Sequence, residues 1–255
     1  MKMKKLIAVM LATVLALSLT ACAVGEEEEE MVPTSPIDYT PVDPTPTGTV
    51  SDADVMTYAE FIAADMESEV TVDVYVQATQ SWWENAITVY AQDPDGGYFI
   101  YGMTCSEADA AKLVPGTKIR VSGVKSEWSG ETEIVDATFL LLEDEEPFIA
   151  EATDVTDLIG KDELQDAQNK LVTFKGMTVD AVSYKNDQPG SNIYVDVSKG
   201  NVKYGFCVEA YLTGPDTEVY AAVGELKVGD TVDLTGFLYW YESPNLHITA
   251  VAEAE

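Results

Sequence analysis

The sequence predicts two tandem copies of one all-β domain with short helices. The stretch LVPGTKIRVSG at residues 113–123 returns as LKVGDTVDLTG at residues 226–236, which is 113 positions later. Each copy of the stretch has a turn closed by a glycine, followed by a strand whose inward residues alternate. Two copies in 255 residues, of which 46% are apolar, indicate two domains that can each bury an ordinary core.

The first copy begins with a short helix and continues with strands. Thr57 and Glu60 form a capping-box pattern, which predicts the start of the helix. Valines then occupy every second position over residues 70–76 with polar residues between them, which is typical of a half-exposed strand. A second capping pattern, Ser106 with Asp109, predicts a short helix between the third and fourth strands. The expected strands are 70–77, 86–92, 98–101, 113–127 with its corner, and 131–141.

The second copy repeats this order with longer insertions. A leading helix is expected over residues 157–168, and a second helix before the fourth strand over residues 218–226. The expected strands are 171–182, 192–198, 204–211, 226–241 with its corner, and 246–251.

This order, three strands, a short helix and two more strands with glycines at the corners of the fourth, resembles the OB-fold. The resemblance implies two tandem five-stranded OB-like Greek-key barrels, over residues 52–146 and 147–255. The outline is also similar to extracytoplasmic OB accessory modules of secreted bacterial nucleases, and it implies architecture rather than activity. The matching residues are Asp95, Gly96, Gly97, Tyr98, Val114, Pro115, Gly116, Val121 and Gly123.

The first residues have the layout of a secretory signal. Three lysines precede an apolar run over residues 6–19, which is too short to span a bilayer. The following Leu-Thr-Ala-Cys at residues 19–22 resembles the lipobox of bacterial lipoproteins, in which the cysteine is diacylated. It implies a signal peptide over residues 1–21 and a lipid anchor at Cys22 on the outer face of the bacterial cell membrane. The alternative is ordinary cleavage at the Ala-x-Ala site of residues 21–23.

An acidic, proline-rich tether is expected over residues 22–51. It contains five consecutive glutamates at residues 26–30, followed by five prolines. Repelling charges and prolines do not form a packed core, so we expect an extended, disordered segment that separates the domains from the membrane.

The charge disfavours nucleic acid as a partner. The chain has a formal net charge of −31, and residues 52–255 hold 38 acidic and 11 basic residues, a formal charge of −27. Affinity for a polyanion comes largely from neutralised phosphates and released counterions, and this field opposes it.

Aromatic residues are the candidate ligand contacts. An OB barrel usually binds on the face of strands two and three, between the loop that joins strands one and two and the loop that joins strands four and five. Aromatic rings at this mouth can stack on bases or sugars or anchor a peptide; the alternative is that they plug the ends of the barrel. The candidates are Trp82, Trp83, Tyr90, Tyr98, Tyr101 and Trp128 in the first copy, and Tyr184, Tyr194, Tyr239 and Tyr241 in the second.

No catalytic, metal or cofactor site is predicted. Cys105 and Cys207 lie in apolar runs and are expected to be buried core residues rather than a disulfide pair. His247, the only histidine, is expected on the surface of its strand. Asp93 and Asp95 favour a turn over a calcium loop, because the further carboxylates of such a loop are missing.

These observations favour a non-catalytic, membrane-anchored lipoprotein that binds a glycan, a peptide or a protein partner through its aromatic loops. Two alternatives stay open. One is an accessory factor that assists a secreted nuclease or glycosidase, with nucleic-acid binding, and the other is a structural spacer on the cell surface.

The anchor can be tested by substituting Cys22→Ala. Loss of the acyl chains removes about 0.8 kcal/mol of membrane affinity per buried methylene, so the variant is expected in the soluble fraction after carbonate washing of membranes. A variant that stays in the membrane fraction contradicts the lipid anchor.

Overall fold

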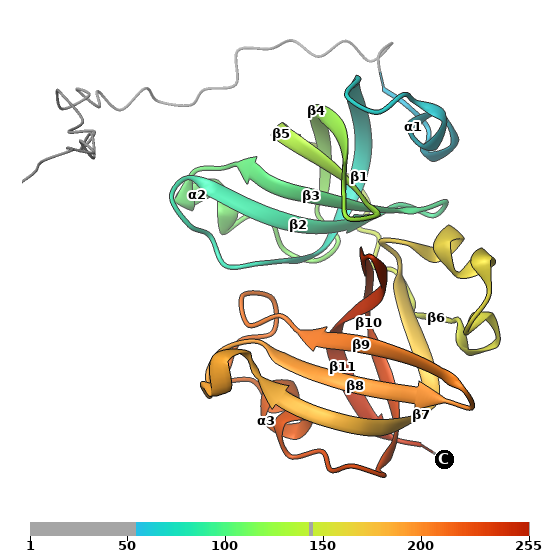
Figure 1. The fold of residues 1–255 in the computed structure, drawn as a ribbon. Helices are drawn as coiled ribbons and strands as arrows, with labels where there is room; N and C mark the ends of the chain where they lie inside the picture. Colours follow the sequence, from blue (N-terminus) through green and yellow to red (C-terminus); the bar gives the residue numbers. More distant parts are fainter. Residues whose placement is uncertain (1–54, 143–144, 255) are drawn as a thin grey trace, which may run out of the picture. The chain divides into compact units, whose positions relative to one another are not determined.

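The computed structural model describes residues 55–142 and 145–254, which form two barrels (Figure 1). The predicted signal peptide, Cys22 and the whole of the predicted tether lie outside the described residues. The described part of the chain has no helix that is long and apolar enough to cross a membrane.

The first barrel is a closed sheet with the strand order β1-β2-β3-β5-β4. Neighbouring strands are antiparallel except β3 and β5, which pair in parallel at Phe99 and Ile100. A short helix separates β3 from β4, as in an OB-fold. The elements are α1 (Tyr58–Ala63), β1 (Glu69–Thr79), β2 (Ala86–Gln92), β3 (Gly97–Thr104), α2 (Glu107–Ala110), β4 (Lys118–Trp128) and β5 (Glu131–Leu141).

The second barrel has the same order, β7-β8-β9-β11-β10, and closes through pairing of β10 with β7. The chain is therefore all-β with short helices and contains two five-stranded OB-like barrels, as predicted. The elements are β6 (Thr153–Asp154), η2 (Thr156–Leu158), η3 (Asp162–Ala167), β7 (Leu171–Tyr184), η4 (Lys185–Asp187), β8 (Ile193–Lys199), β9 (Val202–Val208), α3 (Glu218–Gly224), β10 (Thr231–Tyr241) and β11 (Ser243–Glu253).

The period-two pattern fills the first core. The four valines of β1 at residues 70–76 are at most 2% exposed, and they pack with inward residues of the other strands. The predicted capping box is present, because the Thr57 hydroxyl accepts from the Glu60 N–H while the Glu60 carboxylate accepts from the Thr57 N–H. Local capping and strand alternation thus agree with the tertiary fold.

The predicted leading helix over residues 157–168 is wrong. The segment instead forms two short 3-10 helices, η2 and η3, which follow the short strand β6. Gly160 lies between them with a φ of +76° and donates its N–H to the Tyr204 hydroxyl at 2.9 Å. A backbone in the left-handed region ends a helical turn, so the helix cannot run through.

The repeated glycines of the two copies have the same two roles. Gly116 and Gly229 close the turn before the fourth strand with φ values of +91° and +95°. Gly123 and Gly236 lie where the pairing of the fourth and fifth strands shifts register. A Cβ at Gly236 would stand 2.1 Å from the His247 carbonyl oxygen, and one at Gly123 would stand 2.7 Å from that of Val135. The repeat therefore preserves positions where a side chain does not fit.

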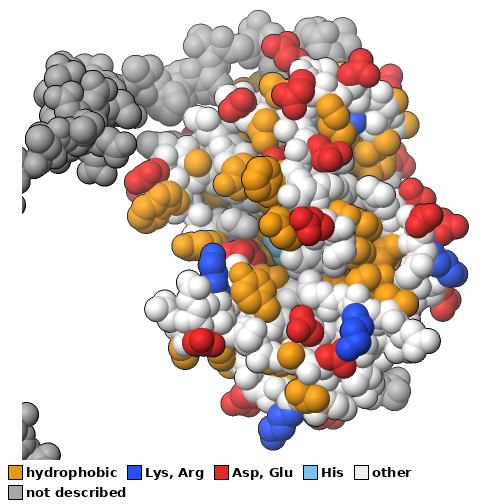
Figure 2. Space-filling view, in the orientation of Figure 1, with side chains coloured by type: hydrophobic (Ala, Val, Ile, Leu, Met, Phe, Trp, Pro, Cys, Tyr) orange, Lys and Arg blue, Asp and Glu red, His pale blue; other side chains and the backbone are white. Residues whose placement is uncertain are grey.

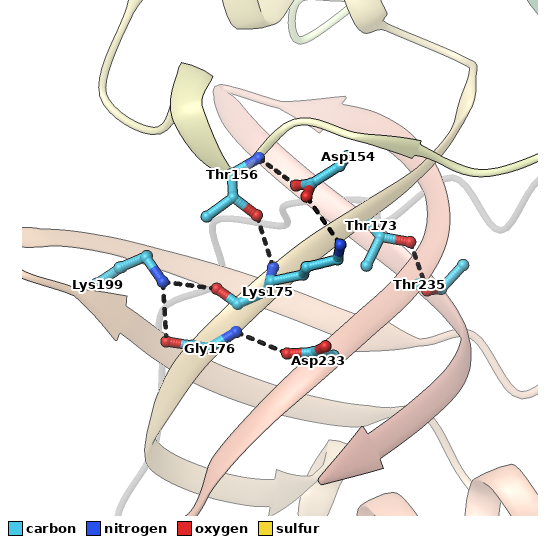
Figure 3. A network of polar contacts seen from close by, with 8 residues as sticks. All are labelled: Asp154, Thr156, Thr173, Lys175, Gly176, Lys199, Asp233 and Thr235. Atoms are coloured by element: carbon cyan, nitrogen blue, oxygen red, sulfur yellow. Dashed lines mark hydrogen bonds and ion pairs between the residues drawn. The ribbon is translucent and has the colours of Figure 1, made fainter. Parts of the chain in front are cut away.

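A polar network holds a bulge where β7 meets β10 (Figure 3). The Gly176 N–H, at a φ of +60°, donates at 2.8 Å to the side-chain carboxylate of Asp233 on the neighbouring strand β10. On the same strand Lys175 pairs with Asp154 at 3.1 Å, and the Asp154 carboxylate also accepts from Thr156. Hydrogen bonds from Thr156 and from the ammonium group of Lys175 lower the pKa of Asp154 to about 2. The network fastens β6 to the barrel wall.

The two barrels share an aromatic contact. Tyr90 and Phe99 of the first barrel and Phe237 of the second form one buried cluster, in which the Tyr90 and Phe237 rings stack with centroids 4.7 Å apart. Backbone and amide bonds flank the cluster: the Leu171 N–H donates to the Gln92 side chain at 3.0 Å, and further bonds join residues 129–132 to the second barrel. The faces that meet are therefore interior surfaces.

Glu131 is a buried acid at this contact. Its side chain is fully buried, one oxygen accepts from the Trp240 N–H at 2.7 Å and from the Gln168 amide at 3.3 Å, and the other oxygen has no partner among the described residues. Burial and, to a smaller extent, the nearby Glu133 raise the pKa of Glu131 against the hydrogen bonds that lower it, to about 9. The carboxyl group is therefore protonated in the folded chain at pH 7.

A Glu131→Gln variant tests this assignment. An unfolded glutamate ionises near pH 4.5, whereas the folded one keeps its proton to about pH 9. The stability that it contributes is complete below pH 4.5 and is lost as the pH rises, by about 1.4 kcal/mol per pH unit. The glutamine variant escapes this loss, so its free energy of unfolding in urea should exceed that of the wild type at pH 8 and approach it at pH 5.

The exposed residue Glu127 provides the control, since Glu127→Gln should shift stability little at either pH. Equal stability changes for Glu131→Gln at pH 5 and pH 8 would contradict a neutral, buried Glu131.

Candidate ligand-binding cleft

A cleft of about 600 Å³ opens between the two barrels, on the β3 side of the first. Figure 2 shows hydrophobic side chains gathered near the middle of one face of the molecule and acidic side chains scattered more widely. Both barrels contribute to the cleft, so neither forms it alone. The lining residues are Gln80, Phe99, Tyr101, Trp128, Glu133, Lys185, Asn192, Glu209, Tyr211, Tyr239 and His247.

Three exposed aromatic side chains edge the cleft. Tyr101 on β3, Trp128 at the end of β4 and Tyr211 after β9 are 57%, 59% and 67% exposed. The Tyr211 carbonyl accepts from the Ser81 N–H at 2.8 Å, which ties this segment of the second barrel to the loop between β1 and β2 of the first. Large rings that stay exposed on both sides of a hollow are available to a ligand.

A second cavity of about 450 Å³ adjoins the first through Tyr101 and Tyr211. It is lined by the two tryptophans of the loop between β1 and β2. Trp82 donates its indole N–H to the Cys105 carbonyl at 2.8 Å and packs on the first core, so it closes the end of the barrel. Trp83 is 72% exposed. Trp82 therefore takes the structural role that was the alternative in the sequence analysis, whereas the ring of Trp83 is accessible at the second cavity.

The polar side chains of the cleft include two carboxylates and two amides. Glu133 is 8% exposed, and burial raises its pKa. Across the cleft, Asn192 donates its amide to the Glu209 carboxylate, and its own carbonyl accepts from the Ala210 N–H at 3.1 Å. Lys185 is the one basic side chain in the lining. Fixed carboxylate and amide groups of this kind are suited to neutral donors such as hydroxyls.

His247 is buried, so the prediction of a surface residue is wrong. Strand alternation does turn it away from its own core, but the first barrel covers that face and leaves it 7% exposed. Its Nδ1 lies 2.7 Å from the Tyr90 hydroxyl, and its ring stacks on Tyr239 with centroids 4.5 Å apart at 19°. Burial lowers the pKa of His247 to about 3, so the ring is neutral at pH 7.

Tyr90 and Tyr98 are also buried, at 2% and 1% exposure, which corrects their prediction as ligand contacts. Tyr90 belongs to the contact between the barrels. Tyr98 lies in the first core against Phe61, and its hydroxyl donates to Asp93 at 2.8 Å. Burial raises the pKa of both hydroxyl groups. Both residues therefore have structural roles, Tyr90 between the barrels and Tyr98 inside the first barrel.

The tyrosines predicted in the second copy separate by position. Tyr239 lines the cleft. Tyr184 packs on the second core beside Tyr220, with ring centroids 6.3 Å apart. Tyr194 and Tyr241 are 41% and 51% exposed but line neither of the two cavities. One of the four therefore shares the cleft with the candidates of the first barrel.

Sequence reasoning missed several lining residues. Gln80, Glu133, Asn192 and Glu209 are polar residues in an acidic chain, and nothing in their spacing distinguishes them. Tyr211 is the last residue of the predicted third strand of the second copy. An aromatic residue at the end of a strand was the one feature of the sequence that could have identified it, and its ring is exposed.

The remaining sequence predictions concern structural residues. Cys105 and Cys207 are free and buried as expected, and burial raises the pKa of their thiols to about 11 and about 12. Asp93 forms the predicted turn, in which its carboxylate accepts from the Asp95 and Gly96 N–H groups at 2.8 and 2.7 Å. Over residues 55–142 and 145–254, no group of three or more His, Cys, Asp or Glu side chains is placed to hold a metal ion.

Comparison with known proteins gives weak matches. No protein-family model matches the sequence, and the search of curated proteins gave no match. Among solved structures, a murine DNA-binding protein bound to double-stranded DNA matches at 12% identity and a TM-score of 0.37, over 72% of this chain and 96% of that chain. The Ifi202 HINa domain in complex with 20bp dsDNA matches at 13% identity and a TM-score of 0.33, over 74% and 98%.

A replication protein A heterotrimer bound to ssDNA matches at 12% identity and a TM-score of 0.31, over 73% of this chain and 49% of that chain. At this level of similarity no property of these proteins is transferred to the chain. The strand order and pairing of the chain itself establish its two OB-like barrels.

Proposed function

We propose that the chain is a non-catalytic, lipid-anchored extracytoplasmic protein that binds a neutral oligosaccharide in the cleft between its barrels. The observation that carries the proposal is the set of three exposed rings, Tyr101, Trp128 and Tyr211, which edge a hollow containing buried polar groups. The lipobox-like sequence at Cys22 supports the anchor.

The rings support a sugar ligand because a pyranose has flat faces of C–H groups that pack on aromatic rings. Burial of such apolar area contributes about 25 cal/mol per Å². Tyrosine and tryptophan also combine a large rigid surface with a polar edge, which suits a ligand that is apolar on its faces and polar at its rim. Because the rings come from both barrels, they could pack on successive sugar units of one oligosaccharide.

The polar lining supports the hydroxyl groups of a sugar. Glu133, Glu209, Asn192 and Gln80 provide carboxylate and amide groups around the cleft. A site built from a few placed polar groups amid apolar surface fixes the orientation of its ligand. Hydroxyls donate to these acceptors without carrying charge into an acidic cleft.

Electrostatics weigh against a phosphate backbone. The cleft holds two glutamates and one lysine, and residues 52–255 have a formal charge of −27. A nucleic acid needs several basic contacts to release its counterions, which this lining does not offer. A role as an accessory to a secreted nuclease therefore has less support than a role in glycan binding, and a role as spacer leaves the exposed rings unexplained.

Titration calorimetry of the full chain tests the proposal. The probes are cellohexaose, xylohexaose, mannohexaose and chitohexaose, with a single-stranded 15-mer of dT for comparison. We expect at least one oligosaccharide to bind and the DNA not to bind at physiological salt. Trp128→Ala and Tyr211→Ala should each weaken sugar binding about tenfold, which corresponds to about 1.4 kcal/mol.

Tyr241→Ala is the matched control, because Tyr241 is exposed but lies outside both cavities. Its affinity should equal that of the wild type. Failure of all four sugars to bind, or tight binding of the DNA, would overturn the proposed ligand class. Equal losses in all three variants would show that the rings of the cleft have no special role.

A further inference from the structure

A hydrogen-bonded chain of three side chains crosses the contact between the barrels and ends in the cleft. The Gln80 amide donates to the Tyr90 hydroxyl at 3.2 Å, and that hydroxyl lies 2.7 Å from Nδ1 of His247. Gln80 and His247 both line the cleft, whereas Tyr90 is buried between them.

The hydrogen bonds among Gln80, Tyr90 and His247 indicate which nitrogen of the imidazole carries its hydrogen. A tyrosine hydroxyl has one hydrogen to donate. Gln80 donates to the Tyr90 oxygen, so the hydrogen of the Tyr90 hydroxyl has an acceptor among these three side chains only when the hydroxyl donates to Nδ1 of His247. Tyr90 keeps this hydrogen, since burial raises its pKa well above the ordinary value. A neutral imidazole that accepts at Nδ1 carries its own hydrogen at Nε2.

The ring is also fixed in orientation. Tyr239 stacks on one face at 4.5 Å, and Tyr90 meets the imidazole at 69° with centroids 5.9 Å apart. Tyr90 is in turn stacked on Phe237. Nε2 makes no hydrogen bond to any residue in the described part of the chain, while His247 forms part of the cleft lining. A rigid, neutral N–H donor is thus part of the cleft lining, together with the carboxylates of Glu133 and Glu209.

We infer that Nε2–H of His247 is the donor that orients the ligand in the cleft, by bonding to a hydroxyl or ring oxygen of the sugar, and that Gln80 and Tyr90 hold the tautomer that makes this possible. The inference rests on the proposed function. It adds that, at His247, the protein donates the hydrogen bond and the ligand accepts it. A ligand is then selected for an oxygen acceptor at this position, since an ammonium group or an amide N–H placed there offers Nε2–H no lone pair.

The single histidine allows a direct test by long-range ¹H–¹⁵N spectroscopy of the ¹⁵N-labelled full chain. Without ligand, Nδ1 should give the signal of an unprotonated nitrogen and Nε2 that of a protonated one, unchanged between pH 5 and pH 8. In Tyr90→Phe the fixed tautomer should be lost, and the two signals should move toward each other. A role confined to packing predicts no such change.

The ligand contact is tested in the same spectra with the four hexasaccharides named above. A sugar that binds should shift the Nε2 signal, and His247→Phe should weaken its affinity about tenfold. Hydrogen on Nδ1, a charged ring, or an unmoved Nε2 signal while a sugar binds would each overturn the inference and leave the proposed function intact. If no sugar binds, the proposed function fails, and the assigned ligand contact fails with it.

The spectra of the wild type decide the tautomer even if a variant does not fold. Gln80→Ala gives an intermediate case, because it removes the donor that sets the direction of the chain but leaves Tyr90 and His247 in contact. It should mix the two tautomers and weaken sugar binding less than His247→Phe. Retention of the pure Nε2–H form in Gln80→Ala would show that Gln80 does not set the direction.

Discussion

The contact of Tyr90 with Phe237 and His247 is the constraint on which the rest of the molecule depends. It joins two barrels that are each closed by their own strand pairing. Because the ring of one barrel packs on the sheet of the other, faces that an isolated barrel would expose to water become interior surface. The cleft exists at the border of this contact, where the packed rings give way to exposed ones.

This arrangement separates the aromatic residues into two groups with different physical roles. Tyr90, Phe99 and Phe237 are buried and supply apolar contact between the barrels. Trp128 and Tyr211 remain exposed at the rim, where the proposed ligand would bury them. Buried polar groups beside them, Glu131 and His247, stay neutral at pH 7 because the contact removes them from water.

Local sequence patterns predicted the fold well because each of them depends only on residues within one barrel. Valines at every second position of β1, capping at Thr57 and the paired glycines of the repeat each act over a few residues, and all agree with the observed sheets. The leading helix of the second copy failed for a local reason as well, since the left-handed Gly160 interrupts it. The position of Gly160 inside the predicted helix was the one feature of the sequence that indicated a break.

The site was less predictable because it depends on what covers an outward face. Strand alternation places His247 and Tyr90 away from a core, and a single sequence does not show that a second barrel lies over them. Polar lining residues such as Asn192 and Glu209 come from separate loops and strands, so no spacing links them to Trp128. The lipid anchor predicted at Cys22 lies outside the described residues and stays a prediction.

The most direct measurement of the central claim is the response of the four tryptophan indole N–H signals to added oligosaccharide. Trp128 lines the cleft, whereas Trp240 lies beside Gly130 and lines neither cavity. The account predicts a saturable shift of the Trp128 signal with the Trp240 signal unmoved. A sugar that binds while Trp128 stays unchanged, or a Trp128 shift caused by single-stranded DNA alone, would contradict a glycan site between the barrels.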